Sequence, residues 1–293
     1  MEEASSPCHS HSHSHSHSHS DSSPCCSCWT TYVMVAVCVV VPLLYQTSRI
    51  FKYYFKMCLY ILTVNIIALG AILYALPRPR NTANTSFVVF MVKKFLMKLL
   101  GVEVTVRGED KLKQQEPAIL CINHQSSVDM LPLFYTWPKN TVCLAKKELW
   151  YFGTFGLGAW LCGTVYIDRL NHERARKTME DTANLIKTNK FKVAIFPEGT
   201  RNHKGSLLPF KKGAFHLAVQ GQVPVIPIVF SSYDTFYNRT EKRFDEGRVL
   251  VEVLPPIPTT GLTAEDVTDL TEKTRNVMLE AYDRISEEVK TMK

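Results

Sequence analysis

The chain has 293 residues, of which 46% are hydrophobic, and it carries a formal net charge of +7. This length is enough for one well-packed core, with apolar sequence left over for a membrane. The basic residues form no recognisable nucleic-acid-binding module, so an anionic bilayer or an acidic substrate is expected rather than nucleic acid. Nine cysteines, several of them inside apolar segments, form no disulfide framework and indicate a reducing environment.

The first 28 residues are polar and include six alternating His-Ser pairs from His9 to Ser20. A tract of this composition cannot build a core, so we predict a disordered tail over residues 1–28. The histidines are able to bind zinc or copper, and a plain solvated tail is the alternative. The cysteine cluster that follows, Cys25 to Cys28, fits palmitoylation, or a metal or redox site.

Two apolar segments predict a membrane anchor over residues 29–80. Trp29–Tyr45 and Met57–Leu76 contain no charged residue and are close to the roughly 20 residues that a membrane-spanning helix needs. Three cations lie between them (Arg49, Lys52, Lys56), and two full spans would place these cations in a lumenal loop. A shallow hairpin in one leaflet, or one span with an interfacial helix, avoids that placement.

A third uncharged stretch, Leu149–Ile167, is also long enough to cross a bilayer. A crossing there would put His124 and Arg169 on opposite sides of the membrane. The four glycines of this stretch favour instead a tight apolar turn packed under the site or dipping into one leaflet.

Residues 90–293 predict a separate α/β domain. Strand patterns fall at 117–122, 141–145, 164–167, 192–196, 224–230 and 248–254, and helical patterns at 127–136, 171–189, 211–220 and 264–289. This alternation indicates a layered α/β fold with functional residues at the ends of strands.

The segment from Asn123 to Asp129 follows the apolar run that ends at Ile122. It places His124 just before a helix and Asp129 in the first turn, where the carboxylate can reach back to one ring nitrogen. The other nitrogen would then be free to act as a general base. A histidine and an aspartate at this spacing are a weak signal when they occur alone.

Three further polar blocks follow in order: Gly163–Arg169, Phe196–Arg201 and Val223–Ile228. Together the four blocks resemble those of the glycerolipid acyltransferases, and the run from Phe196 to Val229 is similar to the 1-acyl-sn-glycerol-3-phosphate acyltransferases of the alpha/beta type. The resemblance covers about residues 90–260. It implies a layered domain with a central mixed sheet, preceded by a membrane-embedded helical segment.

The resemblance implies transfer of an acyl chain from acyl-CoA to the sn-2 hydroxyl of 1-acyl-sn-glycerol-3-phosphate, which gives phosphatidic acid and CoA. His124 would be the general base and Asp129 would fix its tautomer, with no covalent intermediate. Cys121 lies in a predicted buried strand and no nucleophile elbow is present, which disfavours a covalent route. No zinc-binding or nucleotide-binding motif is present, so neither a metal nor a resident cofactor is expected.

Substrate binding falls on the two middle blocks. Arg169 would contact the substrate phosphate, with an ion pair to Asp168 or Glu173 as the alternative. Glu198 would orient Arg201 or bind a substrate hydroxyl, and Gly199 would allow a tight turn beside the ligand. The remaining predicted contacts to phosphate or to acyl-CoA are Thr200, Arg201, Lys146, Lys211, Lys212 and Pro224.

Other functions remain open at this point. The acceptor could be glycerol-3-phosphate or another lysophospholipid, and a metal-binding or membrane-remodelling protein without enzymatic activity is the more distant alternative. The expected partners are lysophosphatidic acid, acyl-CoA and the bilayer. We expect the endoplasmic reticulum membrane with the catalytic domain facing the cytosol, and the glycosylation sequons at Asn84 and Asn238 would report lumenal exposure.

Overall fold

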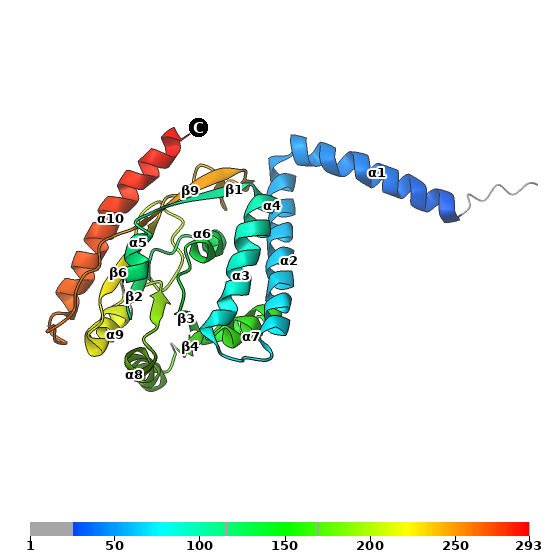
Figure 1. Cartoon of the computed structure of the whole chain (residues 1–293). Coiled ribbons are helices and arrows are strands. Elements are labelled where there is room, and N and C mark those ends of the chain that lie inside the picture. Colours follow the sequence, from blue (N-terminus) through cyan, green and yellow to red (C-terminus); the bar gives the residue numbers. More distant parts are fainter. Residues whose placement is uncertain (1–25, 115–116, 169, 293) are drawn as a thin grey trace, which may run out of the picture. The chain divides into compact units, whose positions relative to one another are not determined.

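The computed structural model describes residues 26–114, 117–168 and 170–292 (Figure 1). The chain divides into two units, Met1–Gln46 and Thr47–Lys293. The whole described part of the first unit lies in helix α1 (Cys26–Thr47), and its residues Trp29–Thr47 are long and apolar enough to cross a membrane by length and composition. Most of the predicted tail, including every residue of the His-Ser tract, lies outside the described residues.

Within the described residues of the second unit, seven strands form one sheet in the order β1-β9-β6-β2-β5-β3-β4. The strands are β1 (Val102–Arg107), β2 (Ile119–Ile122), β3 (Thr141–Lys146), β4 (Val165–Ile167), β5 (Lys192–Ile195), β6 (Val225–Phe230) and β9 (Gly247–Val253). All pairs are parallel except β6 with β9. The sheet is therefore mixed, as the resemblance implies.

The parallel pairing brings the ends of five strands to one edge of the sheet. Ile119 of the central strand β2 lies beside Val193 of β5 and Val225 of β6, and β3 extends the parallel set from β5 to β4. Since the carboxyl ends of parallel strands meet at the same edge, the loops after β6, β2, β5, β3 and β4 are neighbours. Two of the polar blocks, those that begin at Asn123 and at Phe196, lie in these loops.

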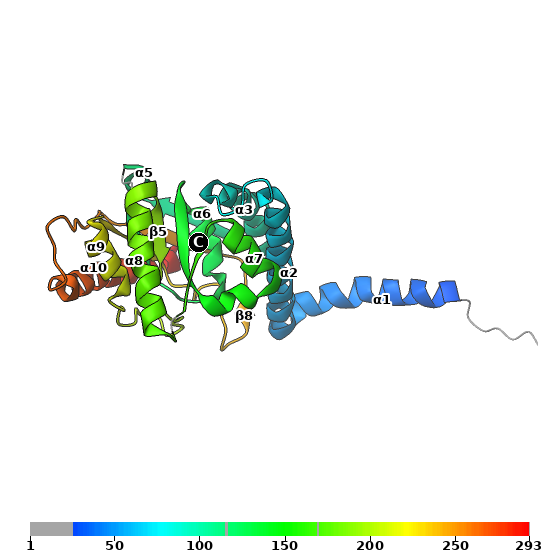
Figure 2. The same cartoon turned by 90° about the horizontal axis from the view of Figure 1, so that it is seen from below.

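Helices cover both faces of the sheet (Figures 1 and 2). One face packs against α8 (His172–Asn189), α9 (Gly213–Gly221) and α10 (Val267–Thr291). The other packs against α2 (Arg49–Ala75), α3 (Thr85–Met91), the π-helical turn Val92–Leu96, α4 (Met97–Leu100), α5 (Asp110–Gln114) and α6 (Met130–Tyr135). Alternate residues of each central strand face the two layers, which explains why these strands read as continuous apolar runs.

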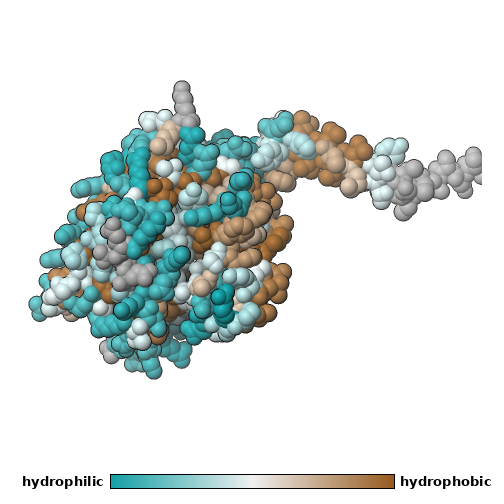
Figure 3. Space-filling view, viewed as in Figure 1, coloured by the Kyte–Doolittle hydropathy of each residue, from teal (hydrophilic) through white to brown (hydrophobic). Residues whose placement is uncertain are grey.

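Helix α2 belongs to the second unit, whereas the sequence analysis groups it with α1 in an anchor. One face of α2 is buried against the domain, and on that face the Lys56 ammonium donates to the Leu100 carbonyl (2.7 Å) and the Tyr60 hydroxyl to the Ser127 carbonyl (2.7 Å). The opposite face exposes large apolar side chains, and Figure 3 shows hydrophobic residues gathered where α2 lies. By length and composition α2 can also cross a membrane.

The contacts of α2 also revise the expectation about the cations between the two apolar segments. The helix begins at Arg49, so these cations lie on its first turns rather than in a loop. Lys52 pairs with Asp245 (2.6 Å) and Lys56 is buried. Contacts within the protein therefore hold two of the three cationic side chains, which the sequence analysis had counted against two full membrane spans.

The third apolar stretch forms three separate elements, which confirms that it is not a single span. It contains most of the 3₁₀ turn Lys147–Tyr151, helix α7 (Gly153–Leu161) and β4. At nine residues α7 is too short to cross a bilayer. Gly158 lies so close to α2 that a Cβ there would come within 3.2 Å of the Ala68 carbonyl oxygen.

Candidate active site

The loop after β2, which carries His124, is held in place at both ends by hydrogen bonds. The Asn123 side chain donates to the Phe230 carbonyl (3.0 Å) and accepts from the Phe230 amide (2.7 Å), which fixes the end of β2 against β6. The following turn, Ser127–Asp129, is capped by Ser126, whose hydroxyl accepts from the Val128 amide (3.0 Å). His124 lies between these two fixed points.

His124 and Asp129 are in contact, as their spacing predicts. His124 Nδ1 lies 2.6 Å from Asp129 Oδ2, and the same carboxylate accepts from the backbone amides of Gln125 (2.8 Å) and Ser126 (3.0 Å). The Asp129 side chain is 3% exposed and that of His124 is 20% exposed, while Phe196 stacks on the imidazole with ring centroids 4.2 Å apart. The carboxylate can thus fix the ring orientation and leave Nε2 available.

Glu198 joins the two principal loops of the site. Its carboxylate accepts from the His124 amide (2.7 Å) and the Leu208 amide (3.0 Å), and the side chain is buried. Burial raises the pKa of Glu198, although the two backbone donors oppose that shift. The observed contacts of Glu198 are therefore to the backbone amides of His124 and Leu208 rather than to Arg201, and they hold the loop at residues 123–129 in place.

The rest of the block after β5 forms a turn over the same edge. Gly199 has a φ of +70°, a conformation that favours glycine, and a Cβ at that position would lie 2.9 Å from the Lys211 side chain. Lys211 is held there because its amide donates to the Pro197 carbonyl (2.8 Å). Thr200 and Arg201 are exposed, so the turn presents polar and cationic groups next to His124.

Residues 103–231 match the model of the acyltransferase family. The chain is 43% identical to human 1-acyl-sn-glycerol-3-phosphate acyltransferase alpha over 84% of this chain and 86% of that protein. It is 40% identical to the human beta enzyme over 83% and 88%. The chain belongs to the 1-acyl-sn-glycerol-3-phosphate acyltransferase family.

The fold of the crystallised 1-acyl-sn-glycerophosphate (LPA) acyltransferase PlsC of Thermotoga maritima is similar, with a TM-score of 0.59. The two chains are 24% identical, and the match covers 84% of this chain and 96% of that one.

In this acyltransferase, one of the three remaining predicted contact residues lies near His124 and the other two do not. Lys146 ends β3 at the His124 edge and is exposed. Lys212 points elsewhere, because its ammonium donates to the Thr268 hydroxyl at the start of α10 (2.8 Å). Pro224 directly precedes β6, and its carbonyl accepts from Ile119 at the start of β2, so it lies at the opposite edge of the sheet from His124.

Arg169, the predicted phosphate contact at the end of β4, lies outside the described residues. Its neighbour Asp168 pairs with Lys147 (3.4 Å) and Arg174 (3.7 Å).

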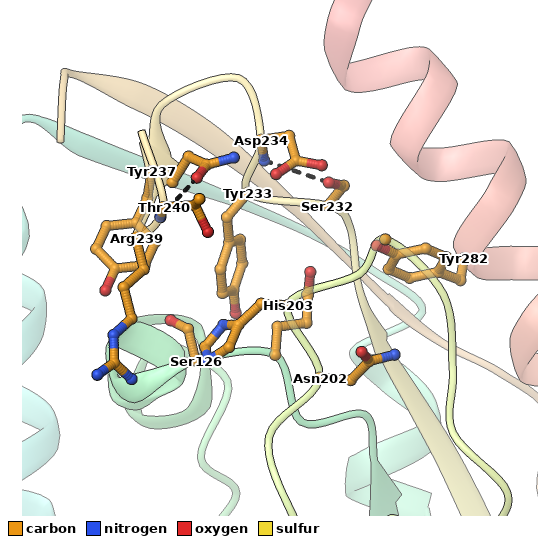
Figure 4. Close-up of a pocket in the computed structure, with 13 residues that line it drawn as sticks. Ser126, Asn202, His203, Ser232, Tyr233, Asp234, Tyr237, Arg239, Thr240 and Tyr282 are labelled. Carbon is orange, nitrogen blue, oxygen red and sulfur yellow. Dashed lines mark hydrogen bonds between the residues drawn. The ribbon is translucent and has the colours of Figure 1, made fainter. Parts of the chain in front are cut away.

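The structure also brings to the site residues that the motifs do not name. A polar pocket is formed by the loop at residues 123–129, three further chain segments and α10, and it is lined by Gln125, Ser126, Asn202, His203, Gly205, Ser232, Tyr233, Asp234, Tyr237, Asn238, Arg239, Thr240 and Tyr282 (Figure 4). His203 lies close after the Phe196–Arg201 block and Tyr233 close after β6. Arg239 lies in the hairpin of β7 (Tyr237–Asn238) and β8 (Arg243–Phe244), which carries no recognisable motif.

Proposed function

We propose that this protein transfers an acyl chain from acyl-CoA to the sn-2 hydroxyl of 1-acyl-sn-glycerol-3-phosphate. The observation that carries the proposal is the 2.6 Å contact between His124 and the buried Asp129, at the strand edge where an α/β fold binds its ligands. The relatives whose printed names state this activity support the acceptor. Acyl-CoA is proposed as the co-substrate, with no resident cofactor.

The reaction requires one proton to move twice. His124 Nε2 takes the proton of the sn-2 hydroxyl as the oxygen attacks the thioester carbon. The tetrahedral intermediate then collapses, the carbon–sulfur bond breaks, and the imidazolium returns the proton to the CoA thiolate. Asp129 holds the tautomer and stabilises the imidazolium, and such a base contributes about 10² to 10⁴ in rate.

Direct transfer fits the side chains near His124. Cys121 is fully buried in β2, and burial raises the pKa of its thiol well above the ordinary value, which disfavours the nucleophilic thiolate. The Ser126 hydroxyl accepts from the Val128 amide and is buried. We therefore assign the attack on the thioester to the substrate hydroxyl itself.

The acceptor phosphate would bind at the cationic turn after β5. Gly199, Thr200 and Arg201 present backbone and side-chain donors there, and Arg169 is proposed as the contact from the end of β4. Lys146 and Lys211 add positive charge along the same edge. Lys212 and Pro224 are not included, because their positions separate them from His124.

We place the protein in the endoplasmic reticulum membrane with the active site on the cytosolic side. Two helices of sufficient length and apolar composition support membrane association, and the cytosol supplies acyl-CoA and keeps thiols reduced. Only one of the two sequons can report topology, because Asn84 is fully buried and its amide donates to the Arg78 and Leu161 carbonyls. Glycan on Asn238 of the active protein would refute this orientation.

A direct test is an acyl-transfer assay on the purified full-length protein. Labelled acyl-CoA is offered with lysophosphatidic acid, glycerol-3-phosphate and other lysophospholipids as separate acceptors. We expect lysophosphatidic acid to give the highest kcat/KM and phosphatidic acid to be the product. A higher kcat/KM for another acceptor would reassign the substrate, and no transfer to any acceptor would overturn the proposal.

A further inference from the structure

The polar pocket of Figure 4 opens beside the catalytic loop, with which it shares Gln125 and Ser126. Its other walls come from the loop at residues 202–205, the segment after β6 and the β7–β8 hairpin. None of the four motif blocks supplies the groups that distinguish it, His203, Tyr233 and Arg239.

Positive charge gathers at the end of this pocket near Ser126. Arg239 extends from the hairpin toward that end, where the His203 ring also lies (Figure 4). The pKa of His203 is lowered by partial desolvation and then by the charges of Arg239 and Arg201, while the charge of Asp129 opposes that shift, so both guanidinium groups and this carboxylate lie within electrostatic range of His203. Glu241, the carboxylate of the same hairpin, pairs with Arg243 (3.2 Å).

The one carboxylate that lines the pocket is at its other end. The Asp234 amide donates to the Ser232 hydroxyl (3.2 Å), and the Asp234 carboxylate lies 3.9 Å from the position that a Cβ on Gly205 would take. Figure 4 shows Asp234 beside Ser232, away from the Arg239 guanidinium. The carboxylate that lines the pocket is therefore separated from the Arg239 guanidinium, and the other carboxylate near that end, Asp129, is already bound to His124, Gln125 and Ser126.

A buried donor without a full hydrogen bond lines the same pocket. Tyr233 is 4% exposed, and its hydroxyl is buried without a hydrogen-bond partner among the described residues. Burial raises the pKa of this phenol, and so does the neighbouring Asp129 carboxylate, through its charge and as an acceptor whose geometry falls short of a full hydrogen bond, so Tyr233 remains a donor at neutral pH. A buried polar group without a partner is costly unless a ligand or water supplies one.

We propose that this pocket binds the phosphate monoester of a substrate, with Arg239 as its cationic contact, His203 as an imidazole N–H donor and Tyr233 as a buried donor. A guanidinium forms charge-assisted hydrogen bonds with a phosphate dianion, and a neutral imidazole and a phenol can donate to its other oxygens. The assignment rests on the proposed function. Both proposed substrates carry a phosphate monoester: the sn-3 phosphate of lysophosphatidic acid and the 3′-phosphate of CoA.

A binding cycle separates these two sources without any turnover. Dissociation constants are measured on the full-length protein in detergent for two ligand pairs. The first pair is a lysophosphatidic acid that lacks the sn-2 hydroxyl and its phosphate-free counterpart, and the second is CoA and 3′-dephospho-CoA. Each pair is measured with wild type, Arg239→Ala, and the charge-matched control Arg248→Ala, whose side chain pairs with Glu103 in another part of the chain.

For one of the two ligand pairs, we expect the phosphate-bearing member to bind more tightly than its counterpart. The factor should be the same for wild type and for Arg248→Ala. Arg239→Ala should reduce that preference about 3- to 30-fold, a range lowered from that of a buried pair because Arg239 is exposed. A loss in the first pair would move the acceptor phosphate from the turn after β5 to this pocket, and a loss in the second assigns the pocket to the 3′-phosphate of the donor. Unchanged preferences in both pairs would overturn the proposal.

A second variant separates binding from folding. Arg239→Lys retains the charge without the planar fork, so it should melt at the wild-type temperature and lose part of the preference. If Arg239→Lys preferred the phosphate-bearing ligand less than Arg239→Ala does, the result would contradict the role of charge. Active wild type with unchanged preferences in Arg239→Ala rejects this inference alone, whereas absence of acyl transfer by wild type rejects the proposed function.

Discussion

Two adjacent regions of this molecule differ in how their polar groups are satisfied. In the catalytic loop, residues 123–129, the side chains of Asn123, His124, Ser126 and Asp129 each have a partner within 3.0 Å. In the neighbouring pocket, the Tyr233 hydroxyl is buried with no partner among the described residues, and Arg239 extends as an exposed cation. The polar side chains of the loop already have their hydrogen-bond partners, whereas the pocket has donors left for a ligand.

This difference separates two kinds of effect on the reaction. Groups already fixed in the free protein can stabilise charge that develops only in the transition state, so their loss lowers turnover. Groups that acquire their partner when substrate binds contribute mainly uniform binding, so their loss raises a Michaelis constant. Substitutions in the two regions therefore test the comparison.

The largest effect is expected at His124. His124→Ala should lower kcat by at least about 10²-fold because the general base is lost, with membrane insertion unchanged. Steady-state kinetics on the purified protein measure this, and His216→Ala on the exposed face of α9 is the matched control. A well-folded His124→Ala protein with a near-normal rate would exclude this mechanism.

Asp129→Asn should come next, with kcat lower by about 10- to 10³-fold, below the full range of a lost base. An amide in place of the carboxylate no longer stabilises the imidazolium and can select the wrong tautomer. It also weakens the cap of the turn, which should cost about 1 kcal/mol of stability. Kinetics beside thermal melts separate the two effects, and Asp181→Asn on the surface of α8 is the control. Equal losses of rate and folded protein would point to a structural role only.

Glu198→Gln tests the link between the loops and has a signed pH dependence. An amide oxygen can replace only one of the two acceptors that His124 and Leu208 use, and the loss of one hydrogen bond should lower kcat about tenfold. Because the folded-state pKa of Glu198 is raised, its contribution to stability is complete below the ordinary value and declines as pH rises through the raised one. The stability of the variant relative to wild type should therefore increase with pH. Melts from pH 4 to 7 that show the opposite trend would contradict the raised pKa.

Tyr233→Phe should have a small effect, and the effect should fall on a Michaelis constant rather than on kcat. Removal of a hydroxyl without a partner should leave the melting temperature unchanged or slightly higher, and kcat should stay near the wild-type value. The Michaelis constant for one substrate should rise about 3- to 10-fold, the worth of one hydrogen bond. Tyr151→Phe, at a 74% exposed position, is the control. A large loss of kcat would place Tyr233 with the catalytic loop instead.

Much of the fold follows from local patterns in the sequence. Strands β2, β3, β4, β5, β6 and β9 lie within two residues of their predicted bounds, because buried parallel strands read as apolar runs between polar loops. The contact of His124 with Asp129 was also predictable, since both side chains lie in one short segment. Strand β1 was missed although Val102, Val104 and Val106 alternate with polar residues in the manner of a half-buried strand.

What could not be predicted depends on contacts between distant segments. The antiparallel pairing of β6 with β9 and the burial of Lys56 against Leu100 depend on tertiary packing. The same holds for Glu198, which the motif suggested as a partner of Arg201 or of a substrate hydroxyl and which accepts from the His124 and Leu208 amides in the structure. Arg239 is more than 100 residues beyond His124 in the chain, and its hairpin carries no motif, so only the folded structure brings it to the pocket.

The smallest effect is expected from the tail, which precedes both regions. Deletion of residues 1–24 should leave specific activity within about twofold, because the His-Ser tract is too polar to pack and comes before every residue of the site. Weak zinc or copper binding should disappear with the tract, and in the full-length protein it should fade below pH about 6 as the imidazoles protonate. Acyl transfer and metal titration, each at matched membrane content, measure both. If the truncated protein lost most of its activity, or no longer needed a metal that the full-length protein requires, the tail would be a regulator of the catalytic domain.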